Sequence, residues 1–202
     1  TVRVGVDSVD LTQHEVHPRG EEPQPRLDQV VGLIDSERQQ QQARLIQMLA
    51  VLVDQGRINW DDKIIDHMPD FRMYDPWVTR EMTIRDLLVH RSGLGLGAGD
   101  LLFVPRSNLS RAETVRRLRN IRPATSFRSG YAYDNVLYVA AGQLIEEVSG
   151  LTWEQFMLRN VLAPAGMTRV TVDDATRRAT PNAARPHARL NAAMAGPERD
   201  PP

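Results

Sequence analysis

The sequence has no cysteine, a single lysine, little net charge and no long apolar run. Without cysteine, disulfides and thiol chemistry are excluded. A formal net charge of −1 over 202 residues does not favour nucleic acid as a partner. The longest unbroken apolar segment, residues 48–53, is far shorter than the roughly 20 residues that cross a bilayer, so we expect no membrane span. The composition, with 41% hydrophobic residues, predicts one globular domain or two small ones.

The scarcity of lysine is the most restrictive of these absences. Of the 25 basic residues only Lys63 is a lysine, which leaves 24 arginines (25 − 1). A guanidinium supplies positive charge, but it does not deprotonate in proteins. The chain therefore has almost no side-chain amine that could act as a base.

Apolar periodicity predicts a largely helical chain. The clearest helix covers residues 39–55, where apolar residues occupy most of the circumference, and Gly56 supplies a natural C-terminal stop. Three other predicted helices open with a capping pair, a Ser or Thr followed three residues later by Asp, Glu or Gln: Thr83 with Asp86, Ser110 with Glu113, and Thr152 with Gln155. The predicted helices after Gly56 cover residues 83–90, 110–121, 135–148 and 152–162, and short strands are predicted at 1–6 and 168–172.

Two clusters of potential metal ligands are present. His14 and His17 could contact one metal ion, but they lie in a polar, proline-flanked stretch and lack a third ligand nearby. The four aspartates between residues 61 and 70 lack the alternating spacing of a calcium loop and are better explained as solvated turns. We therefore expect neither a metal nor a cofactor.

Three further stretches suggest function but have simpler explanations. Five arginines between residues 111 and 122 could meet phosphates, yet their position opposite an apolar stripe favours a solvated helix face. The glycine-rich residues 93–100 lack the glycine-lysine pair of a phosphate-binding loop and are interpreted as a connection near a cleft. His90 and Ser92 suggest a hydrolase, but the glycine pattern of a nucleophile elbow is absent.

Four blocks, in order along the chain, carry a more specific pattern. They are "LVDQGRINWDD" (52–62), "TIRDLLVHRSGL" (83–94), "FRSGYAYDNVLYVAAGQLIEEVSGLTWEQFMLRNVLAPAGMT" (127–168) and "NAARPHAR" (182–189). Together they resemble the serine β-lactamase-like family, which contains class C β-lactamases, penicillin-binding-protein-like peptidases and related esterases. The resemblance implies hydrolysis of amides or esters through a serine acyl-enzyme. It divides the chain into a divergent N-terminal segment (1–44), a partial family domain (45–190) and a disordered tail (191–202).

The resemblance gives roles to two residues of "YAYDN". Tyr133 would be the phenol that relays a proton to or from the nucleophile and the leaving group. Asn135 would hydrogen-bond the substrate and the lysine of the family's Ser-x-x-Lys motif. Asp134 would be the variable residue between them.

The Ser-x-x-Lys motif itself is missing. Counting back along the helix from Gly56 places the family's serine near Gln39 and its lysine near Gln42, and no serine anywhere in the chain has a lysine three residues later. A carboxamide is not a nucleophile at neutral pH, and it neither accepts a proton there nor lowers the pKa of a nearby phenol from about 10. We therefore expect Tyr133 to stay protonated.

The resemblance implies an α+β fold, the helical portion of a serine β-lactamase-like domain on an incomplete antiparallel sheet. The family's late strands, with a third motif of Lys-Thr-Gly or His-x-Gly type, are expected beyond residue 202. It also implies a small-molecule or peptide substrate (a β-lactam, a D-amino-acid peptide or an ester) and a periplasmic or secreted location, although no export signal is visible in the chain. Oligomeric state is open.

Three interpretations of activity remain. The chain could be an active serine hydrolase, which the missing motif disfavours. It could be a catalytically silent relative that is kept as a binding module. It could also be a gene fragment without independent function, as a slipped reading frame near the nucleophile would produce.

Overall fold

The computed structural model describes residues 42–104, 107–180, 188–190 and 193–195. The chain divides into two compact units, Ile34–Ala183 and Thr1–Leu33 with Ala184–Pro202, and each is described by itself. The predicted strand at 1–6, the His14 and His17 pair, and Gln39 lie outside the described residues.

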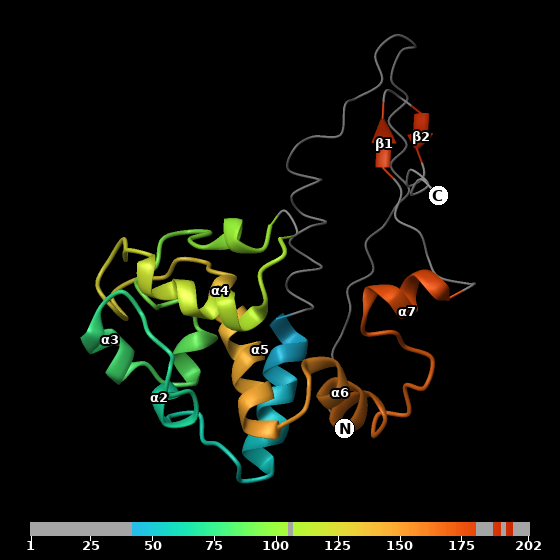
Figure 1. The fold of residues 1–202 in the computed structure, drawn as a ribbon, viewed down its shortest axis with the longest axis horizontal. Helices are drawn as coiled ribbons and strands as arrows, with labels where there is room; N and C mark the ends of the chain where they lie inside the picture. The colour runs from blue at the N-terminus through green and yellow to red at the C-terminus, as the bar shows by residue number, and fades with distance from the viewer. Residues whose placement is uncertain (1–41, 105–106, 181–187, 191–192, 196–202) are drawn as a thin grey trace, which may run out of the picture. The chain divides into compact units, whose positions relative to one another are not determined.

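Helices provide the regular structure of the larger unit (Figure 1). Its α-helices are one over residues 42–54, α2 (Ile64–His67), α3 (Pro76–Glu81), α4 (Arg111–Arg117), α5 (Val136–Ser149), α6 (Trp153–Met157) and α7 (Asp174–Ala179). Tighter 3-10 turns lie at Arg85–Leu87, Asp100–Leu102 and Leu118–Asn120, and a wider π-helical turn lies at Leu158–Leu162.

The helix over residues 42–54 and α5 lie side by side (Figure 1). Gln42, at the start of the first helix, donates a hydrogen bond to the side chain of Asn135, immediately before α5. Arg57, just beyond the end of the first helix, donates to the backbone carbonyl of Val148 near the end of α5. The two helices therefore run in the same direction, with contacts at both ends.

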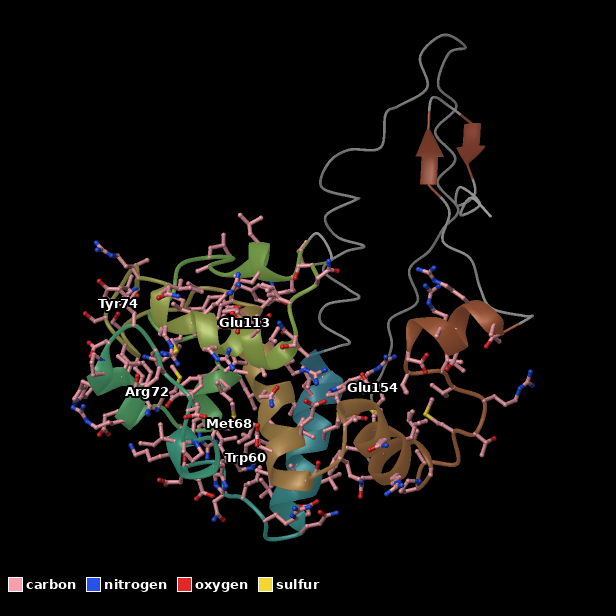
Figure 2. All side chains as sticks on the ribbon, in the orientation of Figure 1. Trp60, Met68, Arg72, Tyr74, Glu113 and Glu154 are labelled. Atoms are coloured by element: carbon pink, nitrogen blue, oxygen red, sulfur yellow. The ribbon has the colours of Figure 1, made fainter. Side chains whose placement is uncertain are left out.

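The core is apolar and draws on most helices of the larger unit. Met68 at the end of α2 is only 6% exposed and lies among the side chains that fill the space beside α5 (Figure 2). Removing such side chains from water supplies the main favourable term in folding. Completely buried core residues of the first helix and of α5 include Met48, Leu49, Leu52, Leu137, Leu144 and Ile145. The predicted buried helix near residues 39–55 is confirmed over residues 42–54.

A glycine on α5 allows α4 to pack close to that helix. A Cβ on Gly142 of α5 would lie only 3.0 Å from Nε of Arg111, so glycine leaves room for that side chain. Arg111 then pairs with Glu146 one turn further along α5, with 2.5 Å between Nη1 and Oε1. The pair fixes the start of α4 on the surface of α5.

The predicted helix ends are confirmed where a capping pair opens α4 and α6. Ser110 Oγ accepts from the backbone N–H of Glu113 at 3.1 Å. Thr152 and Gln155 form a full capping box, because each side chain accepts from the other's backbone N–H at 3.2 Å. Gly56 ends the first helix with a φ of +67°, a conformation that glycine adopts without steric cost.

The predicted helix over residues 83–90 is wrong beyond its first turn. The predicted pairing of Thr83 with Asp86 is present, since the backbone N–H and the hydroxyl of Thr83 both donate to Asp86 Oδ2 at 2.8 Å, but Thr83 is not the N-cap of a helix. Only a 3-10 turn over Arg85–Leu87 follows. The chain then changes direction at His90, whose φ of +56° is incompatible with a continuing right-handed helix.

The predicted strand over residues 168–172 is also wrong, because these residues form no regular structure. The next segment, for which no helix was predicted, contains the short helix α7. Its cap is Asp173, whose side chain accepts from the backbone N–H of Thr176 at 2.8 Å. The capping signal was present in the sequence, but α7 is too short to show an apolar stripe.

Strand pairing is limited among the described residues. In the smaller unit, β1 (Ala188–Leu190) pairs antiparallel with β2 (Ala193–Ala195). In the described part of the larger unit, the pairing is a single bridge between Lys63 and Thr83. The helical portion of the expected α+β fold is therefore observed, and its antiparallel sheet is not seen beneath the described helices.

Candidate functional site

Tyr133, Asp134 and Asn135 occupy the short approach to α5. Backbone hydrogen bonds hold this approach against the segment that follows His90. The N–H of Ala132 donates to the His90 carbonyl, and the N–H of Gly97 donates to the Tyr133 carbonyl, both at 3.0 Å. The glycine-rich segment predicted to lie near a cleft thus contacts the motif directly.

Asn135 joins three segments that are distant in the sequence. Its Oδ1 accepts from Gln42 Nε2 at 3.4 Å, and its Nδ2 donates to Asp100 Oδ2 at 3.0 Å. All three side chains are half-buried or partly exposed. Asn135 therefore contacts Gln42, the residue near which the resemblance predicts the family's lysine.

Tyr133 is half-buried and packs against a histidine ring. The ring centroids of Tyr133 and His90 are 4.5 Å apart, with an angle of 30° between the planes. Tyr131 and Tyr138 contact the same imidazole from other directions, at 5.5 and 5.4 Å. These contacts fix His90 within an aromatic cluster and support Tyr133 from one side.

Asp134 is the most deeply buried residue of the motif, with no exposed surface. Its Oδ2 accepts from Ser92 Oγ at 3.1 Å. Burial raises the pKa of Asp134 to about 6, although hydrogen bonds from the Ser92 hydroxyl and the Leu137 N–H act in the opposite direction. The carboxyl is thus part of the wall beneath the site and not a group that faces a ligand.

His90 and Ser92 support this motif instead of forming a nucleophilic pair. His90 Nδ1 accepts from the backbone N–H of Asp134 at 3.2 Å, and burial lowers the pKa of the imidazole. Ser92 donates its hydroxyl proton to the Asp134 carboxylate and accepts from the Leu94 N–H at 3.1 Å. A serine whose proton goes to a buried carboxylate is a structural anchor, which agrees with the missing nucleophile elbow.

The approach is further anchored by Arg128. Its guanidinium makes two hydrogen bonds to Asp86, Nε to Oδ1 at 2.9 Å and Nη2 to Oδ2 at 2.5 Å. Arg128 has a φ of +61°, in the left-handed region that a non-glycine residue rarely enters. This strained residue and His90 mark the two chain reversals that deliver Tyr133 and Asn135 to one place.

The other charged clusters are engaged in surface pairs. On α4, Arg116 and Arg117 both bond to Glu113, at 2.6 and 2.9 Å, as expected for a solvated helix face. Asp61 pairs with Arg85, and Asp62 contacts His67. Across the described part of the chain, no group of three or more His, Cys, Asp or Glu residues is arranged to hold a metal ion.

No helix in the described residues is long and apolar enough to cross a membrane.

The family is shown by comparison with known proteins. A family model described as Beta-lactamase matches residues 47–202, which is more than half of the chain. The chain belongs to this β-lactamase family, and the family resemblance of the sequence blocks is confirmed.

The relatives include hydrolases and penicillin-binding proteins. Penicillin-binding protein 4 of Amycolatopsis lactamdurans is 28% identical over 117 residues, covering 57% of this chain and 30% of that protein. A protein named unguisins hydrolase, from Aspergillus violaceofuscus, is 27% identical over 129 residues, covering 60% of this chain and 22% of that protein. The chain thus spans less than a third of each of these relatives.

Solved structures agree on the fold. An octameric penicillin-binding protein homologue from Pyrococcus abyssi superposes with a TM-score of 0.63 at 21% identity, over 77% of this chain and 37% of that one. A D-amino acid amidase from Ochrobactrum anthropi gives a TM-score of 0.51 at 25% identity, over 63% of this chain and 38% of that one. At this level of identity, the likeness supports a shared β-lactamase and penicillin-binding-protein fold.

Sequence reasoning missed Asp100 and the buried role of Asp134. Asp100 is the last residue of the glycine-rich segment. Its carboxylate at that place was the one sequence feature that could have marked it as a site residue. Asp134 was treated as the variable residue of the motif. Its burial follows from the direction of α5, which a sequence pattern does not reveal.

Proposed function

We propose that this chain is a β-lactamase-family domain that binds a small carbonyl ligand without forming an acyl-enzyme. The contact that carries the proposal is the hydrogen bond from Gln42 Nε2 to Asn135 Oδ1. It supports the assignment of Gln42 to the lysine position, because the family's lysine is expected to contact this asparagine. The site then contains an amide where the chemistry requires an amine.

The consequence for catalysis follows from side-chain chemistry. An acyl-enzyme requires a nucleophile and a group that accepts its proton. The amide nitrogen of Gln42 does not accept a proton at neutral pH, and the sequence places Gln39 where the serine would be. Without the ammonium of the family's lysine, we expect Tyr133 to keep its proton and to act as a hydrogen-bond donor.

The remaining groups suit a carbonyl ligand. An asparagine side chain has two N–H donors, and one of them on Asn135 goes to Asp100. The second can donate to the carbonyl oxygen of an amide, lactam or ester. We assign the ligand to these classes, with peptides of D-amino acids first, because a D-amino acid amidase and penicillin-binding proteins are among the relatives.

The same relatives support the α+β architecture, in which the described helices would pack on an antiparallel sheet. We also propose that the family's usual location, the periplasm or the cell exterior, applies here.

Equilibrium dialysis with an N-acyl-D-alanyl-D-alanine peptide tests the binding proposal. The full chain is expected to retain the peptide unchanged in mass, and Asn135→Ala to lose roughly tenfold in affinity because a hydrogen-bond donor to the ligand is removed. Gln143→Ala is the matched control, since Gln143 is on α5 and bonds only to Glu147 among the contacts of its side chain. Hydrolysis of the peptide, or equal loss in both variants, would contradict the proposal.

A further inference from the structure

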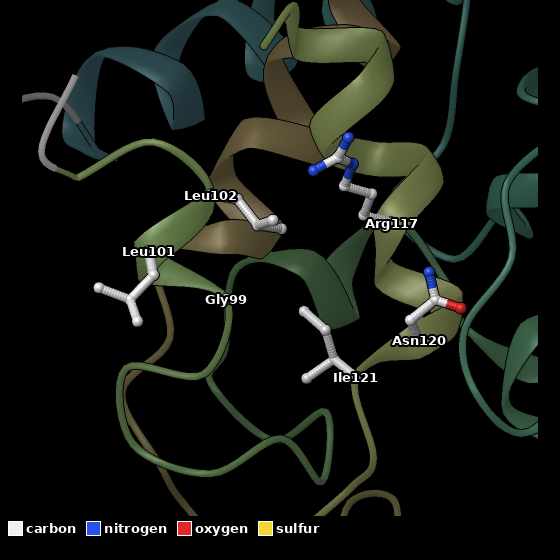
Figure 3. Close-up of a pocket in the computed structure, with 6 residues that line it drawn as sticks. All are labelled: Gly99, Leu101, Leu102, Arg117, Asn120 and Ile121. Atoms are coloured by element: carbon white, nitrogen blue, oxygen red, sulfur yellow. The ribbon is translucent and has the colours of Figure 1, made fainter. Parts of the chain in front are cut away.

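A pocket of about 390 Å³ lies beside Gly99, between the turn that carries Leu101 and Leu102 and the segment from Arg117 to Ile121 (Figure 3). Its lining residues come from two segments: Gly99, Leu101, Leu102, Arg117, Asn120 and Ile121. The volume falls in the range of small-molecule sites, which is about 300–1,000 Å³. None of these residues belongs to the Tyr133 and Asn135 motif.

The pocket is built with apolar walls and one polar side. Leu101, Leu102 and Ile121 supply the walls, and Arg117 extends from α4 toward the turn that carries Leu102 (Figure 3). Gly99 forms part of the floor with a φ of +85°. A Cβ at Gly99 would lie 2.9 Å from Cδ1 of Ile121 and 3.1 Å from Cβ of Val136, so a larger residue there would have to displace its neighbours.

Arg117 can serve a ligand at small cost to the protein. Its contact with Glu113 uses Nε, at 2.9 Å, and this leaves the terminal nitrogens of the guanidinium for a second acceptor. Glu113 also accepts from Arg116 at 2.6 Å, so it keeps a cationic partner if Arg117 turns toward the pocket. The ion pair between Arg117 and Glu113 is partly solvent-exposed and therefore weak.

We infer that this pocket is a second binding site, for a small carboxylate carried on an apolar body. The carboxylate would accept from Arg117 and from the Asn120 amide, and the apolar body would cover Leu101, Leu102 and Ile121. A guanidinium fork matches a carboxylate in two parallel hydrogen bonds. Leu101 is 87% exposed in the chain as it stands, and a ligand with an apolar body would remove that surface from water.

The pocket is separate from the proposed carbonyl site but adjoins it. Asp100 lies between two lining residues of the pocket and accepts from Asn135. A ligand in the pocket would therefore touch the turn that orients the Asn135 amide. Binding of the two ligands can be measured separately, because the variants and probes differ.

The test is calorimetric titration of the full chain with 4-phenylbutyrate, beside 4-phenylbutyramide and inorganic phosphate. We expect saturable binding of the carboxylate only, and a loss of roughly tenfold in Arg117→Gln because a charge-assisted hydrogen bond is removed. Arg116→Gln is the matched control: Arg116 is on the same helix and pairs with the same Glu113, but it does not line the pocket. It should keep its affinity.

A second pair of variants tests the apolar wall. Leu101→Asp places a negative charge at the pocket and should abolish binding of the carboxylate. Leu96→Asp is its control, because Leu96 is 80% exposed and is not a lining residue. Both positions are so exposed that neither substitution should disturb folding, which thermal unfolding of each variant verifies.

Four outcomes would overturn the inference. Equal binding of the amide would show that the carboxylate is not recognised, and equal binding of phosphate would show that the apolar body is not. An equal loss of affinity in the Arg116 and Arg117 variants would show that the carboxylate does not bind in this pocket. Concentration-dependent self-association that Leu101→Asp abolishes, without carboxylate binding, would assign the pocket to a second copy of the chain.

Discussion

Gln42 and Asn135 are 93 residues apart in the sequence and joined by a hydrogen bond of 3.4 Å between Nε2 and Oδ1. The contact connects the start of the helix over residues 42–54 with the start of α5. In the proposed function, Gln42 is the neutral amide that takes the place of the family's lysine. The predictions below test this contact, its surroundings and its chemical consequence.

Replacing Gln42 by lysine should stabilise the chain. The ammonium would donate to Asn135 Oδ1 and would lie near the Asp100 carboxylate, which Asn135 contacts with its other end. A charge-assisted hydrogen bond in place of a neutral one is worth about 1 kcal/mol in the free energy of unfolding. Gln42→Met, of similar length but without a donor, should be less stable than the parent chain. Chemical denaturation at low and high salt measures both, and a lysine variant less stable than the methionine variant would contradict the placement.

The stability of the chain should depend on the ionisation of Asp134. Its pKa in the folded chain is about 6, above the ordinary value of 3.8, so the folded state holds this proton more tightly than the unfolded state. The stabilising contribution is complete below about pH 4 and is lost as the pH rises through about 6. A difference of about two pKa units corresponds to roughly 3 kcal/mol.

Asp134→Asn isolates this contribution, because the amide cannot ionise and still offers an acceptor to Ser92. We expect little difference between variant and parent near pH 4, and a variant that is more stable at pH 7.5. Urea unfolding across this pH range measures the difference. A difference that does not change with pH would show that Asp134 does not titrate as described.

Arg128→Ala should destabilise the chain by about 2 kcal/mol, a value reduced from that of a fully buried pair because Arg128 is 46% exposed. Its partner Asp86 is buried, and burial disfavours its charge. Hydrogen bonds from Arg128 and Thr83 outweigh this effect and hold the pKa of Asp86 below its usual value. Losing Arg128 leaves that carboxylate with only its Thr83 bonds.

The control for Arg128 is Arg85→Ala, which breaks the exposed pair with Asp61. An exposed ion pair contributes little, so thermal unfolding should show little change. Comparable losses in the two variants would mean that burial of Asp86 does not govern the effect.

Thr152→Ala should cost about 1 kcal/mol by removing the capping box at the start of α6. Thr152→Ser keeps the hydroxyl and should restore most of that loss. Equal stability of the alanine and serine variants in denaturant unfolding would show that the cap makes no net contribution.

The sequence predicted the features that depend on local chemistry. The buried helix near Gly56, the Ser110 cap and the Thr152 capping box follow from residues within one or two turns of each other. The family resemblance rested on long sequence blocks, so it did not depend on whether each helix or strand within them was predicted correctly. Tyr133 and Asn135 were selected from that resemblance, and their roles remain predictions.

Features set by distant contacts could not be predicted. The turn at His90 interrupts a helical pattern because the imidazole is held by the backbone of Asp134, 44 residues later. The contact of Asp100 with Asn135 depends on a glycine-rich turn whose path has no periodic signal. The missed helix α7 is too short for its apolar periodicity to be recognised.

Intact-mass spectrometry after incubation with a fluorophosphonate tests the central claim most directly, because this reagent labels activated serines. An active serine hydrolase of the same family, treated in parallel, shows that the reagent works. We predict no adduct on the full chain, because the proposed function has an amide, Gln42, in the place of the proton-accepting amine. A stoichiometric adduct on one serine would contradict the account and identify an activated nucleophile in this chain.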